Sequence, residues 1–358
     1  MKNRKICFFT GSLKQGGAER DISVLSNLFC ERGFDVYIVC VFSKEIFFDI
    51  NKKVKIIFLS DIIKNRSIRS IIKLKSEIIR LQREYCFDYV VGNMIGLNCL
   101  LIYSLKKLTC KTVIRIVSDP KSWTLKNRIL SSIFYKKADC IIGQTSYQIS
   151  CFFKKGLKKT FVIPNICDYE LSFDPSKLFK NTQICYIGRL NARVKRLDLL
   201  IDGFNKFNEL NNNYTLSLFG EFSDKESQDI LLNKIFELGL QEKVFIRGST
   251  KNVQKELEES CCFLFSSPHE GMPNAILEAQ LSGLPVIVSD FNGVDEIVEN
   301  GVNGIIYGFG NVEQLAENLN NLLCDFNNYK LISLNGIASK SKYSIDAVME
   351  QWNNVFKD

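Results

Sequence analysis

The feature that most constrains the fold is an alternation of short apolar runs with helix-like segments, repeated through both halves of the chain. The runs in the first half are KICFFTG, FDVYIVCVF, VKIIFLS, DYVVGN, KTVIRIVS, DCIIGQ and TFVIPN. Those in the second half are TQICYIGRL, YTLSLFGE, KVFIRGS, CCFLFSS, LPVIVSD and GIIYGF. Strands that alternate with helices are typical of βαβ units, in which parallel strands are covered by helices on both faces. The pattern therefore predicts an α/β chain with doubly wound, Rossmann-like parallel sheets.

The length predicts two such domains, because 358 residues exceed what one hydrophobic core usually serves. We place the first domain at residues 1–168 and the second at 169–342, with the Pro-containing stretch IPNICDYELSFDPSKLFKNT as the linker. Residues 343–358 have the pattern of an amphipathic helix. Two doubly wound domains are expected to form a cleft at the carboxyl ends of their strands, where ligands bind.

The composition of the chain limits the cellular compartment and the kinds of site that can be expected. No apolar run is long enough for a transmembrane helix, and the start MKNRKICFFTGSLKQGG reads as a first strand and a glycine loop, not as a signal peptide. The 13 cysteines are scattered without a C-x-x-C pair, and there is a single His, so we expect buried thiols in a reducing cytoplasm and no zinc site.

Charge is divided unevenly between the two halves. Residues 1–170 hold 30 Lys and Arg against 14 Asp and Glu, whereas the remainder holds 17 against 25. The densest basic stretch, residues 62–85, places isoleucines at helical spacing between basic side chains, and residues 152–159 (FFKKGLKK) form a second basic patch. Such a helix can lie on anionic lipid or can pack its isoleucines into the domain core, and both interpretations stay open.

The stretch from Cys261 to Tyr307 carries the strongest chemical signal. It reads as a strand, the loop SSPHEGMP, a helix that opens with NAILEAQ, and a second strand. A helix that follows such a loop offers unpaired backbone N–H groups to an anion near Gly271, Met272 and Asn274, and Pro273 suits the first helical turn. Glu278 follows Asn274 by four residues and shares its helix face.

Cations and glycines follow strands that should face the same cleft. Arg189 and Lys195 come just after the first strand of the second half, where two cations can neutralise a diphosphate leaving group. Arg193 and Arg196 are close enough to be alternatives to Lys195. Gly16 and Gly17 lie between the first strand and the first helix, where missing side chains allow a phosphate or an acceptor to approach.

The segment EGMPNAILEA, followed by SGLPVIVSDFNGVDEIVENGVNGIIY, resembles the nucleotide-sugar-binding segment of retaining GT-B glycosyltransferases of the family 4 type. The resemblance spans nearly the whole chain. It implies that Glu270 lies beside the donor sugar, that Glu278 accepts hydrogen bonds from the ribose hydroxyls, and that Arg189 and Lys195 are the basic pair. It also implies that residues 343–358 join the first domain.

Two further positions enter through the resemblance. Arg247 and Gly248 match the place where relatives hold the base through backbone groups. Asp119 with Pro120 matches an acceptor-domain motif of relatives that act on polysaccharide repeat units, which makes Asp119 a candidate catalytic residue, although Ile116 and Val117 stand where those relatives carry polar residues. The only His, His269, precedes Glu270 and either borders the donor pocket or is a loop residue without a special role.

Together these features predict a cytoplasmic, membrane-associated glycosyltransferase. It would move a hexose or an N-acetylhexosamine from a UDP-sugar, without a metal or another cofactor, to a polyprenyl-diphosphate-linked glycan of a bacterial surface polysaccharide such as O-antigen or capsule. A sugar-nucleotide 2-epimerase shares the fold and is disfavoured by the lack of His in the first domain. A nucleic-acid binder is disfavoured by the few aromatic residues among the basic runs and by the acidic second half.

Overall fold

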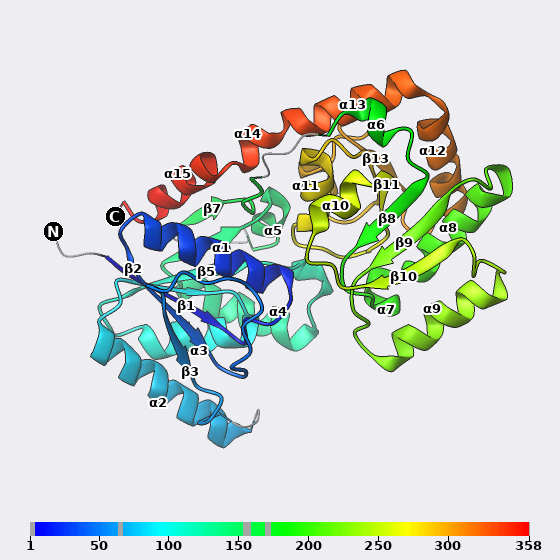
Figure 1. The fold of residues 1–358 in the computed structure, drawn as a ribbon. Helices are drawn as coiled ribbons and strands as arrows, with labels where there is room; N and C mark the ends of the chain where they lie inside the picture. The colour runs from blue at the N-terminus through cyan, green and yellow to red at the C-terminus, as the bar shows by residue number, and fades with distance from the viewer. Residues whose placement is uncertain (1–3, 64–66, 153–158, 169–172, 358) are drawn as a thin grey trace. The chain divides into compact units, whose positions relative to one another are not determined.

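The computed structural model describes residues 4–63, 67–152, 159–168 and 173–357, which pack as two compact units (Figure 1). Unit 1 comprises Met1–Ile166 and Met349–Asp358, and unit 2 comprises Cys167–Val348. This division lies two residues before the predicted boundary, and the returning segment begins at Met349, within the last helix. The cleft expected between the two domains stays a prediction.

Unit 1 contains a seven-stranded parallel sheet in the order β3-β2-β1-β4-β5-β6-β7. Its strands are β1 (Lys5–Thr10), β2 (Asp35–Cys40), β3 (Lys55–Phe58), β4 (Tyr89–Gly92), β5 (Lys111–Ile116), β6 (Cys140–Gly143) and β7 (Thr160–Val162). Every strand predicted for the first half is present. The register is fixed by pairs such as Cys7 with Tyr37 on one side and Cys7 with Val90 on the other.

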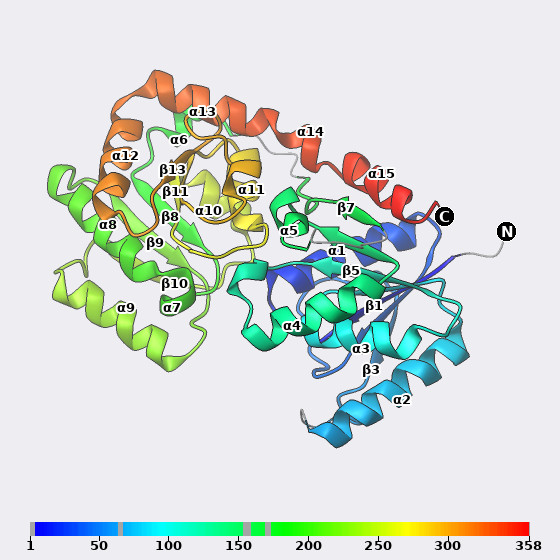
Figure 2. The same cartoon turned by 180° about the vertical axis from the view of Figure 1, so that it is seen from behind.

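Helices cover both faces of this sheet. They are α1 (Gly17–Glu31), α2 (Ile68–Tyr85), α3 (Ile95–Leu105), α4 (Leu125–Phe134), α5 (Ser146–Ser150) and α15 (Ile345–Val355), with short 3-10 turns at Pro120–Ser122 and Tyr135–Lys137. The connection from β1 to β2 through α1 runs in one direction along the sheet, and the connections from β3 to β6 through α2, α3 and α4 run in the opposite direction. Because such crossovers are right-handed, α1 lies on one face of the sheet and the row of α2, α3 and α4 lies on the other (Figure 2). Neighbours in this row are in contact.

The basic helix predicted over residues 62–85 begins at Ile68. The Ser67 side chain caps it by accepting a hydrogen bond from the Ser70 backbone N–H at 3.3 Å. Of its isoleucines, Ile78 is buried, whereas Ile71 and Ile72 are exposed together with Ile68. The buried Ile78 confirms packing into the domain core for one part of the helix, and contact of the exposed part with anionic lipid stays a prediction. Lys64, Arg66 and residues 153–158 of the second basic patch lie outside the described residues.

The last helix packs onto α1 within unit 1 through aromatic side chains. The ring centres of Phe29 and Trp352 are 5.6 Å apart with an edge-on geometry, and Phe356 lies 5.4 Å from Phe29. Both Trp352 and Phe356 are buried. This contact accounts for the apolar face predicted from the spacing of these residues.

A buried ion pair lies beneath the same helix. Arg115 on β5 pairs with Asp21 on α1, and both side chains are almost fully buried. Arg115 also donates a hydrogen bond from Nη2 to Oδ1 of Asn165 at 3.0 Å, and its guanidinium lies 5.8 Å from the Trp352 ring centre. Burial lowers the pKa of Arg115 to about 9, so the group is still cationic at neutral pH and needs the carboxylate beside it.

Unit 2 contains a six-stranded parallel sheet in the order β10-β9-β8-β11-β12-β13. The strands are β8 (Gln183–Ile187), β9 (Thr215–Phe219), β10 (Val244–Gly248), β11 (Ser260–Phe265), β12 (Val286–Ser289) and β13 (Ile305–Tyr307), as predicted. The helices are α6 (Pro175–Leu178), α7 (Ala192–Lys195), α8 (Leu197–Leu210), α9 (Lys225–Glu237), α10 (Val253–Glu258), α11 (Asn274–Leu281), α12 (Val312–Cys324), α13 (Phe326–Ala338) and α14 (Lys340–Tyr343), with a 3-10 turn at Val294–Glu296. The helix α6 lies in the stretch that the sequence suggested to be an irregular linker.

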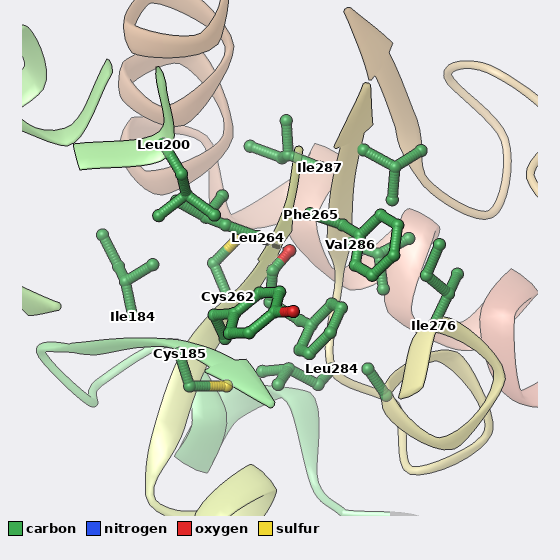
Figure 3. Close-up of a cluster of buried hydrophobic side chains, with 14 of the residues drawn as sticks. Ile184, Cys185, Leu200, Cys262, Leu264, Phe265, Ile276, Leu284, Val286 and Ile287 are labelled. Carbon is green, nitrogen blue, oxygen red and sulfur yellow. Dashed lines mark hydrogen bonds between the residues drawn. The ribbon is translucent and has the colours of Figure 1, made fainter. Parts of the chain in front are cut away.

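The core of unit 2 forms where the central strands meet their helices (Figure 3). Ile184 of β8, Leu264 of β11 and Ile287 of β12 pack with Leu200 of α8 and Ile276 of α11. Nine of the thirteen cysteines are buried, six of them in strands of the two sheets, and all thirteen are free thiols. Among the described residues, no helix is both long enough and apolar enough to cross a bilayer.

Candidate functional site

The topology of unit 2 brings two loops together at one edge of its sheet. Strand β8 lies between β9 and β11, and the chain leaves it toward β9 but later enters β11 on the other side. The loops that follow β8 and β11 therefore meet at a topological switch point, which is where ligands bind in open α/β sheets. The loop after β8 carries Arg189, the short helix α7 that follows this loop ends at Lys195, and the loop after β11 carries Glu270.

The central contact of this site is an ion pair between the two loops. Lys195 Nζ lies 2.5 Å from Oε1 of Glu270, and the side chains are only 22% and 13% exposed. The ammonium also lies 5.8 Å from the centre of the Phe265 ring, at the end of β11. Partial burial strengthens the attraction between these charges relative to that of exposed pairs.

The structure also separates Lys195 from the two cations that were alternatives to it. Arg193 pairs with Glu226, at side chains that are 73% and 56% exposed. Arg196 turns to Asp198, with Nη2 at 2.9 Å from Oδ2. Only Lys195 of these three contacts Glu270, so the geometry selects it for the basic pair.

Hydrogen bonds from serine side chains fix the positions of the segments after β8 and β11 relative to their neighbours. The buried Ser266 donates from Oγ to the carbonyl of Lys195 at 2.8 Å, which fixes the end of α7 against the loop after β11. Ser289 donates to the carbonyl of Ser267 at 2.9 Å. We assigned neither Ser266 nor Ser289 a role from the sequence. The sequence signal that could have identified these two serines is that each is a small polar residue directly at the carboxyl end of a strand, β11 or β12.

Helix α11 begins beside Glu270. Pro273 is the residue before the helix, not a member of its first turn as predicted, and it makes no side-chain cap. Gly271 and Met272 are buried, which brings their backbone close to the strand ends. The N-terminal amides of α11 and its macrodipole favour a negative group at this position.

Glu278 lies one helical turn beyond Asn274 on α11, and it is 3% exposed. A carboxylate that is buried to this extent is costly unless hydrogen-bond donors surround it. The role implied for Glu278, accepting hydrogen bonds from the ribose hydroxyls, stays a prediction.

Tyr186 connects the end of β8 to the loop that carries Arg189. This buried residue on β8 donates a hydrogen bond to the carbonyl of Arg189 at 3.2 Å. Burial raises the pKa of its hydroxyl well above the usual value, the Glu270 carboxylate raises it further, and the Arg189 cation opposes the change. Both charges therefore lie near one tyrosine at the end of β8.

The neighbouring strand ends approach each other through glycines. The Gly220 backbone N–H donates to the carbonyl of Gly248 at 2.8 Å, and a Cβ on Gly220 would lie 1.8 Å from the carbonyl oxygen of Gly188. Gly248 has φ +71, in the left-handed region. Arg247 is exposed at the end of β10, and its guanidinium lies 4.5 Å from the centre of the Phe245 ring.

The remaining predicted residues lie elsewhere. Gly16 precedes α1 in unit 1, and a Cβ on Gly17 would meet nothing within 4 Å, so this loop is open. Asp119, also in unit 1, is buried and accepts hydrogen bonds from the Lys121 backbone N–H at 2.8 Å and the Tyr147 hydroxyl at 3.0 Å. These contacts order the loop after β5. Beside the unit 2 site, His269 is exposed.

Comparisons with known proteins agree with this fold. The sequence model of the family described as "Glycosyl transferases group 1" matches residues 181–325, which lie in unit 2. An uncharacterized glycosyltransferase of Methanocaldococcus jannaschii, MJ1059, is 32% identical over 62% of this chain and 60% of its own length. A Campylobacter jejuni protein that is named as an α-1,4-N-acetyl-D-galactosaminyltransferase acting on an undecaprenol-linked glycan is 24% identical over 97% of both chains.

Solved structures show the same architecture. Anabaena HepE, in complex with UDP and glucose, superposes with a TM-score of 0.81 at 20% identity, over 99% of this chain and 100% of that one. The predicted fold, an α/β chain with two parallel sheets in the GT-B architecture, is confirmed.

Proposed function

We propose that this chain, a glycosyltransferase with the GT-B fold, transfers a hexose or an N-acetylhexosamine from a UDP-sugar to a lipid-linked glycan. The reaction would retain the anomeric configuration and would serve a bacterial surface polysaccharide such as O-antigen or capsule. The observation that carries the proposal is the Lys195–Glu270 pair at the switch point, beside the start of α11.

Charge stabilisation of the leaving group is the main task of such a site. As the bond between sugar and diphosphate breaks, negative charge grows on the phosphate oxygens, and Lys195, Arg189 and the amides of α11 would neutralise it. These groups need no metal ion for that purpose. A diphosphate that approaches Lys195 would share the ammonium with Glu270.

The two glutamates would then have separate roles. Glu270 would accept hydrogen bonds from the sugar hydroxyls and orient the donor, while the buried Glu278 would accept them from the ribose. Gly248, one strand beyond β9, would contact the base through its backbone. The acceptor would attack on the face that the diphosphate leaves, and its proton would pass to the departing phosphate.

The relatives and the charge distribution support the proposed acceptor. The Campylobacter jejuni relative is named for an undecaprenol-linked acceptor. The basic excess of residues 1–170 suits a polyprenyl diphosphate held at an anionic membrane surface, with the enzyme at its cytoplasmic face.

A transfer assay tests this function. The protein is incubated with radiolabelled UDP-sugars and with polyprenyl-diphosphate-linked glycans extracted from bacterial membranes. We expect label to enter the organic phase with release of an equal amount of UDP, and mild acid to liberate a labelled glycan. Label that stays in water-soluble sugar nucleotide as an epimer would contradict transfer and would favour the epimerase.

A further inference from the structure

We propose that helix α4 lies in the plane of an anionic bilayer and inserts its outer apolar side chains into the lipid. The α4 surface consists of Leu125, Ile129 and Ile133, which are spaced by four residues and therefore share one helix face. Their exposed fractions are 74%, 50% and 49%. The only fully buried residue of this helix is Ser131, so α4 turns most of its apolar side chains away from the core of unit 1.

The charges around this surface are of one sign. Residues 120–137 contain Lys121, Lys126, Arg128, Lys136 and Lys137, all exposed, and no Asp or Glu. A helix with exposed Leu and Ile between basic side chains is typical of an interfacial membrane helix. The cations would contact lipid phosphates while the apolar side chains reach the acyl region.

The neighbouring helices extend the same chemistry. The helices α2, α3 and α4 lie side by side in one row (Figure 2). The exposed residues of α2 include Ile68 and Ile72, and α3 adds Tyr103, which is 57% exposed and has the Lys75 ammonium 4.6 Å from its ring centre. The stretches 67–76, 95–109 and 120–137 together hold ten Lys or Arg and no Asp or Glu. The outer side of α3, of α4 and of the first half of α2 is therefore basic and apolar, whereas the second half of α2 also carries Glu77 and Glu84 beside Arg80.

This charge pattern decides between possible occupants. A second copy of the chain that docked through the same face would place these ten cations against ten more, which is repulsive. A bilayer that contains anionic lipid provides both the negative charge and the apolar medium that the α4 surface needs. The proposed function places the enzyme at a membrane surface, and the inference rests on that part of the proposal: it identifies the α4 surface as the region that contacts the lipid.

Vesicle co-sedimentation tests the inference. The full chain is mixed with phosphatidylcholine vesicles with and without phosphatidylglycerol. We expect binding only to the anionic vesicles, a loss when salt rises from about 0.1 M to about 1 M, and an affinity reduced about tenfold or more in the variant Leu125→Gln, Ile129→Gln, Ile133→Gln.

The matched control is Leu232→Gln with Phe236→Gln. These two side chains are exposed at the same four-residue spacing on α9 of unit 2, at 44% and 71%. Equal binding of the α4 variant and the control would overturn the inference, as would a variant that changes the oligomeric state by light scattering and leaves vesicle binding intact.

A parallel UDP thermal-shift measurement separates the two proposals. Retained UDP binding in the α4 variant shows that it is folded. UDP binding without vesicle binding would remove the membrane surface and leave the transferase intact. Vesicle binding without any nucleotide response would support the membrane surface and would contradict the proposed transferase.

Discussion

Replacement of Lys195 by Met is expected to lower kcat/KM for the sugar donor by about 10²- to 10³-fold, the usual effect of removing one group that stabilises charge in a transition state. Of the three clustered cations, only Lys195 contacts Glu270, which precedes the first residue of α11 by four positions. Met keeps most of the length and the apolar stem, so the variant removes the charge and little else. Initial rates of UDP release measure the effect.

Arg193→Met is the matched control, because Arg193 is in the same short helix and its ion pair with Glu226 is exposed. Exposed pairs contribute roughly 0–1 kcal/mol, so its rate should stay near that of the unchanged protein. If Arg193→Met lost as much activity as Lys195→Met, the assignment of Lys195 would be wrong, and general positive charge after β8 would explain both results.

Replacement of Asp21 by Ala is expected to destabilise unit 1 by about 3–5 kcal/mol, because it leaves the buried Arg115 cation without its carboxylate. Both tryptophans of the chain, Trp123 and Trp352, are buried in unit 1, so their fluorescence during urea unfolding reports on this unit. The transition should move to lower urea.

Two further variants give this prediction its controls. Glu45→Ala removes the exposed pair with Lys14 and should change stability by less than about 1 kcal/mol. The double variant Asp21→Leu, Arg115→Met removes both buried charges and should recover most of the loss, since apolar replacements of buried pairs are often tolerated. A single Asp21→Ala variant as stable as Glu45→Ala would show that Arg115 does not depend on the pair.

The sequence was sufficient for the architecture because the signals for it are local. Each strand is a short apolar run with a helical pattern after it, and the order of such units dictates parallel sheets. The predicted start of α2 was several residues too early. The isoleucines before Ser67 continue the apolar pattern of the helix, and the sequence pattern did not reveal that the Ser67 side chain caps the helix and sets its first residue at Ile68. A linker helix, α6, was also missed because it is a single turn.

The sequence predicted which segments form the candidate site, but it did not predict which residues of those segments contact each other. Arg193, Lys195 and Arg196 are equivalent in a list of basic residues, and only the turn of α7 decides which one meets Glu270. The link from Ser266 to the Lys195 carbonyl joins residues 71 positions apart. No spacing rule connects them, because the contact arises from the strand order. The roles assigned to Asp119, Gly16 and Gly17 stay predictions.

The most direct test of the central claim is a thermal-shift measurement with UDP, GDP and ADP on the unchanged protein, on Glu278→Ala and on Glu237→Ala, whose glutamate is exposed at the end of α9. A ligand at 100 times its Kd stabilises the folded state by about 2.7 kcal/mol. The account predicts stabilisation by UDP in the unchanged protein and in Glu237→Ala, and its loss in a folded Glu278→Ala variant. An equal shift in all three proteins would refute the ribose role of Glu278, and the absence of any nucleotide response in folded protein would contradict the donor site itself.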